Sequence, residues 1–113
     1  MSDKAVVMPK LSYQAEQLLA AAEILVGAAD IETRLLAAFR SMPAPEEADL
    51  DAFPDIKKAY AMLIDAATRV RDQPGVDFLQ ATISSLNDEE AERLARQVLS
   101  LLVAVTKVDA QQP

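Results

Sequence analysis

Leucine and alanine recur near the start of the chain at the spacing of an α-helix. Two sets of residues are each spaced by seven positions: Leu11, Leu18 and Leu25, and Ala15, Ala22 and Ala29. Two turns of helix hold about seven residues, so each set forms a line along one side of a helix. The small alanine side chains allow a second helix to approach closely. The pattern predicts a helix over 11–41.

The apolar stripe of this segment moves to a new side after Gly27. The later apolar positions are Ala28, Ile31, Leu35, Ala38, Phe39 and Met42. A straight helix would direct the two stripes toward different neighbours, so we expect a bend or a break between Gly27 and Asp30. If the break is complete, Asp30 is an N-cap, because its carboxylate can accept hydrogen bonds from the amides of the next turn.

A second helix is predicted to start at Pro54, which loses no amide hydrogen bond at a first helical position. It continues to the sequence RDQPG, where Pro74 and Gly75 turn the chain. A short helix then follows, from residue 76 or 77 to residue 86. Its apolar positions recur at helical spacing.

The last helix has the clearest start. Asn87 is followed three residues later by Glu90, the pattern of a capping box, so the helix begins at residue 88. It runs to about residue 108. Leu99 and Val103 form a second apolar side on this helix. A helix that is apolar on most sides is either central in a bundle or shared with another chain.

Together these elements predict an all-α fold, a four-helix bundle whose long first helix bends. Aromatic residues make up 4% of the 113 residues and there are two glycines, which favours helices over a sheet with many turns. The length suits one core. We expect one helical domain over 11–108, between a flexible N-terminal segment, 1–10, and a flexible tail, 109–113.

Residue types that are missing limit the chemistry. The chain has no cysteine and no histidine, so thiolate nucleophiles, imidazole bases and the common ligands of transition metals are absent. Two glycines are too few for a phosphate-binding loop. We therefore predict that the chain is not an enzyme and has no catalytic residue, no cofactor and no metal.

Charge and hydropathy limit the partners and the location. The net charge of −7 repels phosphate backbones, which argues against direct binding of nucleic acid. No run of about 20 uncharged apolar residues is present, and the apolar run before Pro9 is too short for a signal peptide. We expect no membrane association and a cytoplasmic location.

The segment 42–58, MPAPEEADLDAFPDIKK, carries five carboxylates. A calcium loop counted from Asp49 would need glycine at its sixth position and glutamate at its twelfth, where this chain has Pro54 and Tyr60. The segment is therefore not a calcium loop of this type.

Apart from a looser divalent-cation site among its carboxylates, two interpretations of this segment remain. It is either a solvated acidic connector, with Phe53 as a hydrophobic anchor before the next helix, or a docking segment. In the second case Leu50 and Phe53, flanked by Asp49 and Asp51, insert into a groove with a basic rim on a partner protein. The sequence does not decide between them.

Surplus apolar surface is the strongest functional signal. Two apolar faces exceed what a small monomer easily covers. They are the second stripe of the first helix, with Ile24, Ala28, Ile31 and Leu35, and the second side of the last helix, with Leu99 and Val103. We therefore expect a homodimer, since symmetric dimers are the commonest soluble oligomers.

The leading functional hypothesis is a non-catalytic, acidic protein-interaction domain: an adaptor, an assembly chaperone or a protein inhibitor. Its negative field favours a partner with a basic patch. One alternative is an enzyme that uses only carboxylates, for which Glu16, Glu23 and Asp65 are the candidates if they are buried. Another is a structural subunit of a larger assembly.

Overall fold

A computed structural model describes residues 11–42, 44–46, 48–72, 74–75 and 77–111. Within these residues the chain forms five α-helices and one 3-10 helix, and no strand. They are α1 (Ser12–Leu25), α2 (Ile31–Arg40), the 3-10 helix η2 (Ala48–Ala52), α3 (Pro54–Ala67), α4 (Phe78–Ser85) and α5 (Asp88–Ala110). The all-α fold is confirmed, whereas the predicted count of four helices is wrong. The segment 1–10, predicted to be flexible, lies outside the described residues.

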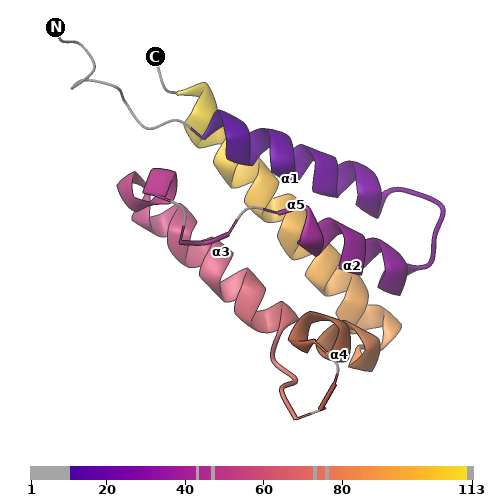
Figure 1. The fold of residues 1–113 in the computed structure, drawn as a ribbon. Helices are drawn as coiled ribbons and strands as arrows, with labels where there is room; N and C mark the ends of the chain where they lie inside the picture. Colours follow the sequence, from indigo (N-terminus) through magenta and orange to yellow (C-terminus); the bar gives the residue numbers. More distant parts are fainter. Residues whose placement is uncertain (1–10, 43, 47, 73, 76, 112–113) are drawn as a thin grey trace, which may run out of the picture.

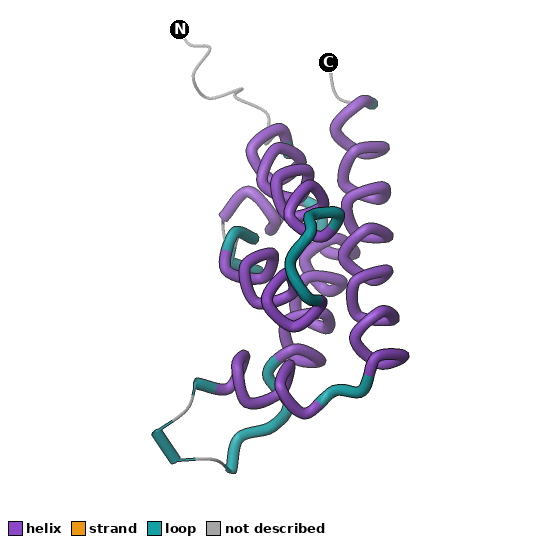
Figure 2. Tube along the Cα trace, turned by 90° about the vertical axis from the view of Figure 1, so that its right-hand side faces the viewer, coloured by secondary structure: helices purple, strands orange, loops and turns teal. Residues whose placement is uncertain are grey.

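α5 organises the fold. It packs against α1 on one side and α3 on the other, and α2 packs against α5 and α4 (Figure 1). α1 runs antiparallel to α5, and the Ser12 hydroxyl donates a hydrogen bond to an Asp109 carboxylate oxygen at 3.1 Å. In the view of Figure 2, α5 is the long helix at the right-hand edge, and the other described helices lie to its left.

The predicted long first helix is two helices, because the chain breaks completely between Val26 and Asp30. Asp30 is the N-cap of α2, as predicted, and accepts a hydrogen bond of 2.8 Å from the Thr33 amide. This bond lowers the pKa of Asp30 below its ordinary value of 3.8. Arg34 donates to the Leu25 carbonyl oxygen, at the end of α1, and to that of Ala29. The turn therefore satisfies backbone groups that a helix end leaves unpaired.

The predicted capping box at the start of α5 is confirmed. The Asn87 side chain accepts from the Glu90 amide at 2.8 Å, and the Glu90 carboxylate accepts from the Asn87 amide at 2.9 Å. From there α5 continues for 23 residues to Ala110. Asp109, assigned to the flexible tail by sequence, is therefore helical.

α3 starts at Pro54, as predicted, but ends at Ala67, before the predicted stop at Pro74. The Thr68 hydroxyl donates to the Ile64 carbonyl at 2.7 Å. The Val70 amide donates instead to the Thr82 hydroxyl of α4 at 2.8 Å. The segment after Thr68 therefore exchanges helical bonds for contact with α4.

The core collects the buried sides of the helices, and its fully buried large residues include Leu18, Leu35, Tyr60, Val98 and Val105. Ile24 and Ile31 are half-buried and pack against this core. The second stripe of the first segment is therefore largely covered within the chain, with Ala28 exposed, so its large side chains give no reason to expect a dimer. Among the described helices, none combines the length and apolar character needed to cross a bilayer.

Candidate functional site

Large apolar side chains are exposed on both sides of α5. Those at least 39% exposed are Tyr13, Leu19, Val26, Met62, Phe78, Leu99 and Val103. Phe78 is partly covered by Arg71, whose guanidinium carbon lies 5.4 Å from the ring centroid. Leu19, Leu99 and Val103 belong to α1 and α5, and Met62 belongs to α3. These residues define the surfaces that contact with another molecule would cover.

The first surface, which we call the α1/α5 face, consists of Leu19, Leu99, Leu102 and Val103. A groove of about 570 Å³ runs between the two helices, with Leu19 on one wall and Leu102 and Val103 on the other. Leu99 precedes Leu102 by three residues and Val103 by four, so it extends the same side of α5 by one turn. The predicted site residues Leu99 and Val103 are 39% and 51% exposed.

Charged residues lie at the rim of this face. Glu16 of α1 and Lys107 of α5 both line the groove, and both are exposed. An apolar centre with a polar rim is the usual composition of a protein contact surface. The face therefore combines an apolar centre with charged residues at its rim.

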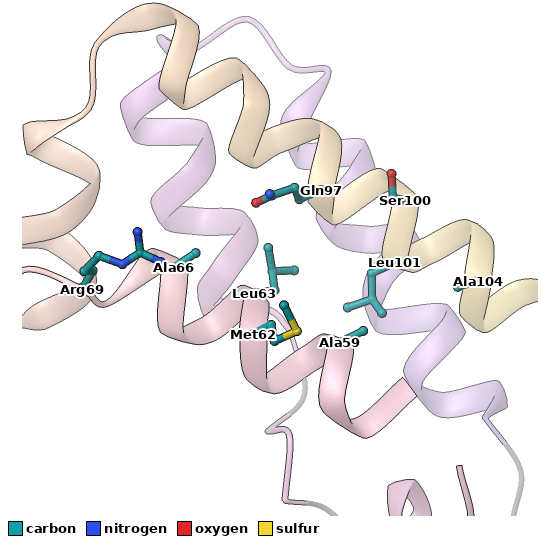
Figure 3. Close-up of a pocket in the computed structure, with 9 residues that line it drawn as sticks. All are labelled: Ala59, Met62, Leu63, Ala66, Arg69, Gln97, Ser100, Leu101 and Ala104. Atoms are coloured by element: carbon teal, nitrogen blue, oxygen red, sulfur yellow. The ribbon is translucent and has the colours of Figure 1, made fainter. Parts of the chain in front are cut away.

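The second surface, which we call the α3/α5 groove, lies on the other side of α5 and has a volume of about 420 Å³ (Figure 3). Leu63 of α3 and Leu101 of α5 extend into the space between the helices, and Met62, 63% exposed, lies beside them. Ala66 also lines the groove. Arg69 is the charged residue among its described lining residues.

The described part of the 42–58 segment fits the predicted connector better than the predicted docking segment. Leu50 lies in η2 and is fully buried in the core, so its side chain is not available to insert into a partner. Phe53 is half-buried against the same core, which fits the anchor role. Asp49 and Asp51 are exposed, and Asp51 pairs with Lys57. The described part of this segment is therefore a connector that is fixed to the core by Leu50.

The candidate carboxylates do not form a buried group. Glu16 and Glu23 are exposed on α1, and Asp65 is exposed on α3. Asp65 lies 3.9 Å from Arg69 and 3.7 Å from Arg71. Among the described residues, no group of three or more acidic, histidine or cysteine side chains is arranged to hold a metal ion.

Sequence reasoning missed Leu19 and Met62. Leu19 follows the buried Leu18 directly and precedes Val26 by seven residues, so it begins a second apolar line on α1. That spacing was the available signal. Met62 likewise lies directly before the buried Leu63 and has no partner at helical spacing that would single it out.

Compared with known proteins, the chain matches no family model, no curated protein and no solved structure.

Proposed function

We propose that this chain is a non-catalytic protein-interaction domain that pairs as a homodimer through the α1/α5 face. The observation that carries the proposal is the exposure of Leu19 and Val103, at 52% and 51%, on opposite walls of one apolar groove. Grouped apolar side chains with a polar rim are typical of surfaces that another protein covers. Leu99 and Leu102 enlarge this group along α5.

The dimer leaves the α3/α5 groove open for a further protein partner. In this role the chain acts in the cytoplasm as an adaptor, an assembly chaperone or a protein inhibitor. The exposed carboxylates of Asp49 and Asp51 favour a partner with a basic patch. The alternative of a carboxylate-only enzyme has less support, because Glu16, Glu23 and Asp65 are all exposed.

The test is to place charge on each surface and to measure the mass in solution. L99E/V103E is expected to convert a dimer into a monomer of 12.2 kDa, because two carboxylates per chain would be buried without partners, at a cost of about 1 to 3 kcal/mol or more for each. Both side chains are exposed in the single chain, so the helical content should not change.

M62E is the matched control, since Met62 is exposed on the α3/α5 groove at 63%. Light scattering and circular dichroism should report a folded dimer for M62E and for the wild type. A wild type that is monomeric at all concentrations would contradict the proposal. So would an L99E/V103E variant that remains dimeric.

A further inference from the structure

The charged edges of the α1/α5 face differ in sign. On α1, Glu16 and Glu23 are seven residues apart and exposed, so they lie along one edge of that helix. On α5, Lys107 lines the groove and Arg96 lies seven residues before Val103, so over the length of α1 these exposed bases lie along the other edge. Asp109 also lines the groove, but it is bonded to Ser12. Glu92 pairs with Arg96 at 3.8 Å and lies one turn earlier on α5, past the level at which α1 ends. Over the length of α1, the apolar residues of the face therefore lie between the acids Glu16 and Glu23 on one edge and the bases Arg96 and Lys107 on the other.

The charges on the two edges are also at similar heights. The Ser12–Asp109 hydrogen bond fixes the antiparallel register of α1 and α5. Counted from this pair, Glu16 is level with Val105 and Glu23 with Val98. Lys107 and Arg96 are each two residues from those levels, or about 3 Å along the helix axis. The long side chains of Lys107 and Arg96 can span this offset along the helix axis.

A twofold dimer can bring two such faces together in two ways. If the axis runs along the helices, α1 of one copy lies over α5 of the other. If the axis runs across the helices in the plane of the interface, α1 lies over α1 and α5 over α5. The first arrangement places the acidic edge on the basic edge twice, because a twofold interface repeats every contact. The second places like charges together.

Resting on the proposed dimer, we infer that the partner of the α1/α5 face is a second copy whose α1 lies over α5, with Glu16 and Glu23 of one copy facing Lys107 and Arg96 of the other. The four helices α1 and α5 of the two copies then form a bundle around an apolar centre, with Leu19, Leu102 and Val103 contributed by both. Opposite charges at the rim select this orientation, since like-charge contacts oppose the other one.

The test exchanges the sign of each edge. E16K/E23K makes both edges basic, and R96E/K107E makes both edges acidic. Each variant alone should dimerise at least about tenfold more weakly than the wild type at low salt. An equimolar mixture of the two should restore dimers, because each edge then meets its opposite. The fourfold variant E16K/E23K/R96E/K107E should also dimerise, with its charges reversed and its net charge equal to that of the wild type.

Net charge alone predicts a different result. E16K/E23K makes the chain less negative than its −7, so general repulsion between copies would fall and dimers would tighten. Loss of the Glu92–Arg96 contact, 3.8 Å and exposed, should have little effect on folding of the R96E/K107E variant. Helical content by circular dichroism checks this for every variant.

Sedimentation velocity over a concentration series distinguishes the outcomes. The inference is supported if E16K/E23K and R96E/K107E each dimerise weakly alone, while their mixture and the fourfold variant dimerise strongly. These differences in dimerisation should shrink in high salt. A wild type that dimerises while E16K/E23K pairs equally well or better overturns the orientation but leaves the proposed dimer intact. A monomeric wild type overturns both.

Discussion

The first helical segment and α5 both carry more apolar residues than one helix side can bury. The first segment covers most of them within the chain, whereas α5 leaves some of them exposed. Between α1 and α2 the chain breaks, so Leu35 becomes fully buried and Ile24 and Ile31 pack against the core. α5 continues unbroken for 23 residues and leaves Leu99 and Val103 exposed at 39% and 51%.

The difference follows from the residues at which each helix can stop. The first segment contains Gly27, which weakens a helix, and Asp30, which caps the next one. α5 contains neither glycine nor proline between Asp88 and Ala110 and starts from a capping box. An apolar helix with an internal break can fold its second stripe inward, whereas an unbroken one keeps it available for another chain.

Among these substitutions, Leu35→Ala should destabilise the single chain most. Because Leu35 is fully buried, the free energy of unfolding should fall by about 3 kcal/mol. Leu99→Ala should cost less than about 1 kcal/mol, since that side chain is partly exposed already. Urea denaturation in a V103E background, in which the proposed dimer should be weakened, measures both. Equal losses would remove the contrast between the two segments.

Leu50→Ala extends the test to the 42–58 segment. Its side chain is fully buried, so the free energy of unfolding should fall by about 2 to 3 kcal/mol. Phe53→Ala should cost less than a fully buried aromatic residue would, because Phe53 is only half-buried. If urea denaturation shows no change for Leu50→Ala, the segment does not belong to the core, and the docking interpretation regains its basis.

Asn87→Ala removes the cap that starts α5 and should lower the free energy of unfolding by about 1 kcal/mol. The reason is that the Glu90 amide loses its acceptor. Asn87→Ser should recover most of the loss, since serine is also a good N-cap. Thermal unfolding followed by circular dichroism measures both. An unaffected midpoint would mean that tertiary packing alone fixes the start of α5.

Asp30→Ala tests the break itself and should produce the smallest change. The folded pKa of Asp30 is lowered by its bond with the Thr33 amide. The carboxylate therefore stabilises the fold at pH values above the unfolded pKa of about 3.9, and this contribution is lost as the pH falls through the folded pKa.

Thermal midpoints of the wild type and Asp30→Ala should accordingly differ near pH 7 and converge in acid. Asp30→Asn is the control, because asparagine caps without titrating at these pH values. A wild-type advantage over Asp30→Ala that persists unchanged in acid would show that the charge of Asp30 is not what stabilises the break.

Local signals in the sequence predicted local features well. Asn87 with Glu90, Pro54 and Asp30 each act within one turn of helix, so their roles could be read from spacing. The end of α3 could not, because it depends on the Val70–Thr82 hydrogen bond between residues far apart in sequence. The same holds for Leu50, whose burial depends on how η2 returns to the core.

Of the candidate site, the sequence identified Leu99 and Val103 on α5 but not Leu19, which lies across the groove. Leu18 and Leu19 are equally apolar, and only the packing of α1 decides which one is buried and which is 52% exposed. Ile31 and Leu35 were predicted to add surplus apolar surface, and that prediction was wrong for a related reason. How far a chain folds back at a break is set by tertiary contacts, which periodicity does not contain.

Cysteine crosslinking tests most directly the claim that α1 of one copy covers α5 of another. The chain has no native cysteine, so E16C and K107C chains, once mixed, each carry a single thiol. A short bismaleimide linker should join E16C to K107C in preference to either like pair. D72C, exposed in the loop after α3, serves as the remote control. Preferential E16C–E16C linkage, or linkage of D72C to K107C at the same rate, would contradict the account.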